Sequence, residues 1–141
     1  MTNKRDSGAT DGMHQVMPFT KMLDIEAVNV QPGEVRARLA WSEDVCTSGG
    51  MMHGGAIMAL ADSTGALAAF LNLPQGASGT STIESKTNFL RAVRSGYAEA
   101  VSRPLHTGKT VVVIETDVVD ADGRLCARVT QSQAVLRADK R

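Results

Sequence analysis

One segment constrains the fold of this chain more than any other, because a glycine-rich start runs into a long apolar stretch. It reads SGGMMHGGAIMALADSTGALAAFLN, residues 48–72, and its only ionisable side chains are His53 and Asp62. The part from residue 54 to 71 approaches the length of a membrane-spanning helix, but Asp62 and two hydroxyl side chains lie at its centre. We therefore predict a helix buried inside a globular domain.

The phase of this helix places the aspartate on one face. At 100° per residue, most bulky side chains fall on one stripe, which we expect to pack on a sheet. Asp62 points away from that stripe, and the small residues around it are unlike the charged side chains of a solvent-facing surface. We therefore expect a second copy of the chain to cover this face. The sheet-facing stripe is Ile57, Leu60, Thr64, Leu67 and Leu71, and the Asp62 face holds Gly55, Ala59, Ala66 and Ala69.

A carboxylate at such a position must be paired, hydrogen-bonded or used in chemistry. Asp62 could be structural, accepting hydrogen bonds from Ser63 or from the backbone of a partner chain. It could also share a site with His53, nine residues earlier. Nine residues of helix correspond to about 180° of rotation and roughly 13 Å of rise, so the two side chains cannot meet within one helix. A site that uses both would therefore lie between two subunits.

The residues HGGA at 53–56 suggest the electrophilic half of a site. Gly54 and Gly55 leave backbone N–H groups uncovered at the positive end of the helix dipole, where they can stabilise an oxyanion. The same glycines could simply allow a tight turn into the helix. Their combination with a carboxylate two and a half turns later is more specific than either feature alone.

The remaining sequence predicts a single domain with six strands. The 141 residues suffice for one hydrophobic core, and we divide them into a disordered polar tail, residues 1–17, and one domain, residues 18–141. Turn signals separate the extended segments, and the long helix follows the second of them. The short links after the helix predict an antiparallel meander. The expected strands lie within residues 23–30, 35–41, 80–93, 97–105, 109–119 and 124–136.

Composition and spacing argue against several functions. Fifteen basic residues balance fifteen acidic ones, so neither nucleic acid nor a membrane is expected as a partner. Two cysteines without a CxxC spacing, and no signal-peptide pattern, favour the cytoplasm. The three histidines lack metal-ligand spacing, so no metal is expected. The TGKT segment is no phosphate-binding loop, because Arg103 stands where glycine is required. A cysteine hydrolase built on Cys46 has only the proximity of His53 in its favour.

Three segments together resemble a known enzyme family. They are MMHGGAIMALADSTGALAA, STIESKTNFLRAVRSG and GKTVVVIETDVVDADGRLCARVTQSQAVL. They are similar to the hotdog-fold acyl-CoA thioesterases, in the branch of phenylacetate-degradation and 4-hydroxybenzoyl-CoA thioesterases, over residues 20–137. The resemblance implies an α+β hotdog fold, in which a curved antiparallel sheet wraps a long central helix.

The same resemblance has consequences for assembly and substrate. It implies a homodimer whose sheets join edge to edge, a homotetramer made of two such dimers, and active sites shared across the dimer interface. It also implies an acyl-CoA substrate and a role in the degradation of aromatic compounds. No separate cofactor is expected, because coenzyme A is part of the substrate.

The family's site residues carry over by position. Asp62 matches the acidic residue, which acts as nucleophile or as general base, and the backbone N–H of Gly54 matches the oxyanion donor. His53 matches the residue that orients the helix start and the thioester. Thr47 stands where relatives often have Asn or Gln. Thr82 matches the hydroxyl residue that holds a water near the carboxylate from across the interface.

Residue types suggest what binds the rest of an acyl-CoA. The coenzyme phosphates need cations, and small side chains around Asp62 leave room for an aromatic ring or a short or medium alkyl chain. The candidate cations are Arg91, Arg94, Lys109 and Arg137, and the small residues are Gly55, Gly65 and Ala66.

Two other functions stay open from the sequence. A hotdog hydroxyacyl-thioester dehydratase or hydratase would use His53 as the base, so replacing His53 would abolish turnover. A non-catalytic acyl-CoA-binding protein is the second alternative. Regulators of that kind need an attached DNA-binding segment, and the 17 residues before Pro18 are too few to fold as one.

Overall fold

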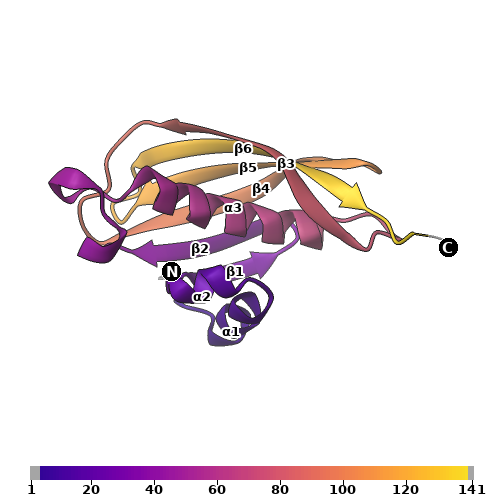
Figure 1. The fold of residues 1–141 in the computed structure, drawn as a ribbon, viewed down its shortest axis with the longest axis horizontal. Coiled ribbons are helices and arrows are strands. Elements are labelled where there is room, and N and C mark those ends of the chain that lie inside the picture. Colours follow the sequence, from indigo (N-terminus) through magenta and orange to yellow (C-terminus); the bar gives the residue numbers. More distant parts are fainter. Residues whose placement is uncertain (1–3, 140–141) are drawn as a thin grey trace.

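A six-stranded antiparallel sheet curves around one long helix in the computed structural model, which describes residues 4–139 (Figure 1). The helix is α3, Gly54–Leu71, and two short 3-10 turns, Glu43–Val45 and Ser48–Gly50, precede it. The predicted α+β class, the long helix and the six strands are confirmed. The strands are β1 Glu26–Gln31, β2 Glu34–Ala40, β3 Gly79–Phe89, β4 Tyr97–Thr107, β5 Val111–Asp120 and β6 Leu125–Leu136.

The strand order departs from the predicted meander. The order is β1-β2-β4-β5-β6-β3, so β3 pairs with β6 at one edge of the sheet and not with β4. Residues 90–96 cross the β5–β6 turn to reach β4, and the N–H groups of Leu90 and Arg91 donate to the carbonyl of Cys126. Seven extended residues reach about 23 Å, whereas three strand spacings need only about 14 Å. A short link therefore did not oblige β3 and β4 to be neighbours.

Alternation along the strands gives the sheet an inner face that packs on α3. Residues of β5 alternate between half-buried and buried over its whole length. Val112 and Ile114 pack with the second half of α3, and Val118 packs with its first half. On β4, Ala98 and Ala100 are fully buried, and their small size lets the helix lie close to the sheet.

Helical phase predicted the buried face of α3 only in part. Ile57, Leu60 and Thr64 are buried as expected, but the side chain of Asp62, although largely exposed, contacts strands β3 and β6 and does not point away from the sheet. Ala69, expected on the Asp62 face, is instead fully buried against strands β2 and β5. The curved sheet covers more than one stripe of this part of the helix. By length and mean hydropathy, 1.4, α3 could cross a membrane, but eight of its residues are buried within this domain.

The predicted disordered tail is wrong for most of its length. Helix α1 spans Ser7–Val16 and helix α2 spans Pro18–Met22. Both lie beside the β1 end of the sheet (Figure 1). Residues 1–3 of the predicted tail lie outside the described part of the chain.

Local signals within a polar composition explain why α1 folds. Asp6 caps the helix, because its side chain accepts a hydrogen bond from the N–H of Ala9 at 2.9 Å. The hydroxyl of Thr10 accepts a hydrogen bond from the N–H of Ala27 at 3.0 Å, which ties the helix to β1. Met13 is buried in the main core. One buried methionine, one capping aspartate and one threonine hydroxyl were too weak a pattern to identify from the sequence.

Candidate active site

The ring of His53 organises the start of α3. His53 is the N-cap residue, and its Nδ1 accepts a hydrogen bond from the N–H of Gly55 at 2.7 Å. A neutral imidazole with Nδ1 as acceptor carries its proton on Nε2, so Nε2 is a donor. A Cβ at position 55 would lie 2.9 Å from Nδ1. Gly55, predicted to contact substrate, therefore makes room for the capping ring.

The N–H of Gly54 is free to bind a ligand. It makes no hydrogen bond with any residue between 4 and 139. Gly54 lines a cavity of about 350 Å³ together with Thr47, Arg91 and Phe89. The ring of Phe89 packs on Gly54, since a Cβ there would lie 3.2 Å from the ring. An unpaired N–H at the start of an 18-residue helix is suited to stabilise an oxyanion.

The carboxylate of Asp62 faces strands β3 and β6. The amide Nε2 of Gln131 donates to Oδ1 at 3.1 Å, and the hydroxyl of Thr82 donates to the same oxygen at 3.4 Å. Gln133 donates to the hydroxyl oxygen of Thr82 at 2.7 Å, which leaves the hydroxyl proton of Thr82 for Asp62. No side chain in the described part of the chain donates to Oδ2 of Asp62. One carboxylate oxygen is therefore held while the other is available.

Partial burial changes the acidity of this carboxylate. Desolvation raises the pKa of Asp62 above the ordinary aspartate value, and the hydrogen bond from Thr82 opposes the rise. By contrast, the backbone N–H of Arg124 is the main cause that lowers the pKa of Asp120, as is usual for a structural turn. A carboxylate with a raised pKa is a better base, and such groups are typical of catalytic sites.

Gly65 serves the site indirectly, through Gln131. A Cβ at position 65 would lie 2.1 Å from Oε1 of Gln131. Gly65 is itself buried, and Gln131 is fully buried between the helix and the sheet. Gly65, predicted to leave room for substrate, instead leaves room for the amide that reaches Asp62. Ala66, the next residue, is half-buried and lines a separate groove.

A single chain does not bring the two halves of the predicted site together. Gly54 and Asp62 are eight residues apart on the same helix, which corresponds to about 12 Å along its axis. Thr47 lies on the Gly54 side. Thr82 was predicted to reach the carboxylate from across an interface, and it instead contacts Asp62 of its own chain. The arrangement therefore contains an oxyanion-binding half and a carboxylate half.

Comparison with known proteins decides the family. The profile of the thioesterase superfamily matches residues 49–127, which is more than half of the chain and includes Gly54 and Asp62. The chain belongs to the thioesterase superfamily. A relative from Saccharolobus solfataricus, whose name assigns it to the esterases, is 36% identical over 117 residues, covering 83% of this chain and 82% of the relative.

Two further similarities agree with this assignment. The 1,4-dihydroxy-2-naphthoyl-CoA hydrolase of Escherichia coli is 34% identical over 87 residues, which cover 62% of this chain and 63% of that enzyme. The crystal structure of a thioesterase from Haemophilus influenzae superposes with a TM-score of 0.83 at 25% identity, covering 96% of this chain and 94% of that one. The expected hotdog fold and the expected class, a thioester hydrolase, are confirmed.

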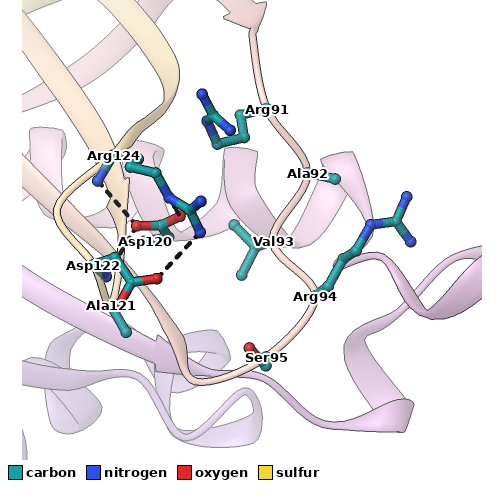
Figure 2. A pocket seen from close by; sticks show the side chains of 9 residues that line it. All are labelled: Arg91, Ala92, Val93, Arg94, Ser95, Asp120, Ala121, Asp122 and Arg124. Atoms are coloured by element: carbon teal, nitrogen blue, oxygen red, sulfur yellow. Dashed lines mark hydrogen bonds and ion pairs between the residues drawn. The ribbon is translucent and has the colours of Figure 1, made fainter.

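The basic residues predicted to bind phosphates fall into two groups in this thioesterase. Arg91 and Arg94 line a pocket of about 280 Å³ beside the β5–β6 turn (Figure 2). In that view Arg94 points away from the turn, and its guanidinium donates to the carbonyl of Gly49 at 3.0 Å. Arg91 makes no ion pair with any described residue. It lines both this pocket and the Gly54 cavity.

The second basic group lies at the far end of the sheet. Arg137 donates to the carbonyl of Lys109 at 3.2 Å and to that of Gln75 at 3.4 Å. Lys109 precedes β5, whereas the pocket beside Arg91 lies at its other end, so the ten residues of β5 separate the two groups by about 30 Å. The four predicted cations do not form one site within a chain.

A different nucleophile and a metal find no support in the geometry. Cys46 shares a cavity of about 300 Å³ with His53, but its thiol donates to the carbonyl of Ser42 at 3.2 Å. Within residues 4–139, no three His, Cys, Asp or Glu side chains are placed to hold a metal ion.

Proposed function

We propose that the chain is an acyl-CoA thioesterase in which Asp62 and the N–H of Gly54 supply the chemistry. The observation that carries the proposal is the carboxylate of Asp62, whose one oxygen is held by Gln131 and Thr82 while the other is open. Membership of the thioesterase superfamily supplies the class of reaction. The name of the E. coli relative, a CoA-thioester hydrolase, supports coenzyme A as the leaving group.

In the proposed reaction, the Gly54 N–H donates to the thioester carbonyl oxygen and stabilises the negative charge that develops there. Asp62 either attacks the carbonyl carbon directly or removes a proton from the attacking water. The C–S bond then breaks, and coenzyme A leaves as a thiolate. On the route of direct attack, water then hydrolyses the acyl-aspartyl anhydride, which releases the acid and restores the Asp62 carboxylate. A thiolate leaves without prior protonation, so no general acid is required. The products are a carboxylic acid and free coenzyme A.

The edge of β3 supports a site shared by two subunits. β3 is an edge strand within the described sheet, and it carries exposed Ile83 and Phe89, which suit pairing with another chain. Gly54 lies beside the Phe89 end of the strand, and Asp62 lies beside Thr82. Antiparallel pairing with β3 of a second copy would align the Phe89 end of one strand with the Thr82 half of the other. Gly54 of one subunit would then approach Asp62 of its partner.

Arg91 is the best placed of the predicted cations for the coenzyme phosphates. It lies on the same cavity as Gly54 and has no ion-pair partner among residues 4–139. We propose that coenzyme A extends from Gly54 past Arg91. The proposal also includes a cytoplasmic homodimer that assembles into a homotetramer, with an aromatic or a short- or medium-chain acyl group and no separate cofactor.

The geometry favours thioester hydrolysis over dehydration. A dehydratase would need His53 as a base with a free nitrogen lone pair. Nδ1 of His53 already accepts from Gly55, and Nε2 of the neutral ring carries the proton. His53 is therefore suited to orient the helix start, and Asp62 is the better base.

The test is thiol release from a panel of aromatic and aliphatic acyl-CoAs by the wild type and by Asp62→Asn. We expect the wild type to release thiol and the folded Asn variant to lose about a hundredfold to ten-thousandfold in kcat. Equal rates for the two proteins would refute the role of Asp62. Cleavage of no thioester by the wild type would refute the proposed function.

A further inference from the structure

An apolar groove lies between helices α1 and α3, and it is larger than the cavities beside His53 and Gly54. Its volume is about 560 Å³, within the range of small-molecule sites. The α1 wall includes Gly12, Met13 and Val16, and the α3 wall includes Ala66 and Phe70. No charged side chain from the described part of the chain lines it, and its one side-chain hydroxyl belongs to Thr80. Val16 and Phe70 are 72% and 58% exposed, so the groove is open.

The groove begins one helical turn from Asp62, which does not itself line it. Ala66 follows Asp62 by one helical turn on the same face of α3. Thr80 lies two residues before Thr82 on the same face of β3. Hydrogen bonds connect them, because Thr80 donates to Gln133, Gln133 donates to Thr82, and Thr82 donates to Asp62. A group bound at Asp62 therefore has an apolar groove within one helical turn, on the side of α1.

The shape and polarity of the groove select among acyl groups. The lining residues of α1 run from Ala9 to Val16, which is about 10 Å of helix. Their spacing of three and four residues makes a straight wall. A hydroxylated aromatic acyl group would leave its hydroxyls without partners along this wall. A linear alkyl chain needs no partners and fits an elongated hollow.

We infer that this groove binds the acyl chain of the substrate, and that the chain is an unbranched alkyl group of medium length. The inference rests on the proposed thioesterase function and narrows its substrate class. The α1 helix forms the side of the groove that selects the length of the acyl chain, and the thioester carbon lies at the end of the groove nearest Asp62. Each methylene that enters the groove should raise kcat/KM by about fourfold until the groove is full.

The experiment measures kcat/KM for a series of linear acyl-CoAs, from acetyl to palmitoyl, with benzoyl-CoA and phenylacetyl-CoA for comparison. The variant Gly12→Leu adds a side chain where nothing lies within 4 Å of a Cβ, so it fills the groove without a clash. The control Asp11→Leu adds the same side chain to an exposed position of α1 that does not line the groove. The oligomeric state of all three proteins is measured by light scattering.

We expect a medium alkyl chain to be the best substrate of the wild type. Gly12→Leu should lower the ratio of kcat/KM for medium chains to that for acetyl-CoA by at least about tenfold, and Asp11→Leu should leave this ratio unchanged. Thioester cleavage with no dependence on chain length, or with an aromatic optimum, would overturn the inference and leave the proposed function intact. An altered oligomeric state of Gly12→Leu with an unchanged ratio would mean that a second subunit occupies the groove. Cleavage of no thioester would overturn both proposals.

Discussion

One buried amide is the nearest side-chain donor to the carboxylate of Asp62. Gln131 is fully buried, and its Nε2 approaches the carboxylate oxygen more closely than the hydroxyl of Thr82 does. Hydrogen bonds to a charged carboxylate favour the ionised form, whereas partial burial of Asp62 favours the neutral form. In the proposed mechanism, the hydrogen bond from Gln131 therefore favours the ionised form of Asp62 that the reaction needs.

We predict that Gln131→Met shifts the pH dependence of the enzyme. Methionine fills a similar volume without a donor, so the ionised form of Asp62 loses a hydrogen bond and its pKa rises further. A bond to a charged group contributes about 1.5–3 kcal/mol, which corresponds to one to two pH units. Because Asp62 must be ionised, activity falls as pH drops through its pKa. The acidic limb of kcat/KM should therefore move to higher pH by about that amount.

A matched control separates this effect from damage to the core. Gln133→Met removes a buried amide from the same strand, but Gln133 reaches Asp62 only through Thr82. The acidic limb of the kcat/KM profile should therefore move less in Gln133→Met than in Gln131→Met. An unchanged limb in a folded Gln131→Met protein would contradict the role assigned to Gln131.

Sequence reasoning identified the residues of this site that belong to a motif and missed the ones that depend on packing. Asp62, Gly54 and His53 lie within one segment, so their spacing and helical phase could be interpreted directly. Gln131 lies 69 residues from Asp62, and its contact depends on the register of β6 and the closeness of α3. Buried glutamine is uncommon, and Gln131 and Gln133, which alternate on a strand, were the available signal.

The close approach of α3 to β6 depends on Gly65. Any side chain there would displace the amide of Gln131, which is fully buried and has no solvent to move into. We predict that Gly65→Ala destabilises the domain, because overpacking costs about 1–3 kcal/mol and exceeds the gain in helix propensity, about 1 kcal/mol. Urea unfolding at equilibrium measures the difference, and kcat/KM should fall as well because Gln131 moves.

The same substitution on another helix provides the reference. Gly12→Ala lies inside α1, and no atom lies within 4 Å of its Cβ. It should stabilise the protein by about 0.5–1 kcal/mol through helix propensity alone. If Gly65→Ala proves as stable as Gly12→Ala, then α3 and β6 are not held as closely as Gln131 requires.

The elements themselves followed from local patterns, and their arrangement did not. Alternation and turn signals located all six strands, and one apolar run located α3. β3 pairs with β6, which is distant from it in the sequence, and not with β4, which follows it. The 90–96 link is long enough for either pairing, so local patterns could not decide between them. Helix α1 was missed because its stability comes mainly from Met13 and from contacts with β1, which local composition does not reveal.

The two halves of the site lie about 12 Å apart along the axis of α3, and this separation bears on how many subunits one active site needs. Helix geometry alone predicted that His53 and Asp62 could not meet within a chain, and the separation of Gly54 from Asp62 along α3 agrees with it. Completing the site within the proposed assembly requires the edge of β3 and a second copy. Two different defective subunits should therefore be able to form one intact site.

Mixing Asp62→Asn with Gly54→Pro tests this consequence. Gly54 is the first residue of α3, where proline is tolerated, and proline there removes the one N–H proposed to bind the thioester while it adds a side chain beside Phe89. His53 already has the extended conformation that precedes proline, with φ −61° and ψ 135°. Gly54→Ala, which adds a Cβ at the same 3.2 Å from the ring of Phe89 but keeps the N–H, is the control and should stay active.

Each variant alone should lack activity, since every site contains its defect. After the two are unfolded together and refolded in equal amounts, half of the dimers are mixed, and each mixed dimer has one site with both Gly54 and Asp62 intact and one site with neither. The mixture should regain about a quarter of wild-type activity. A site built within one chain would give no recovery at any mixing ratio, because no chain in the mixture carries both groups. Recovery near a quarter would place Gly54 and Asp62 of each working site on different subunits.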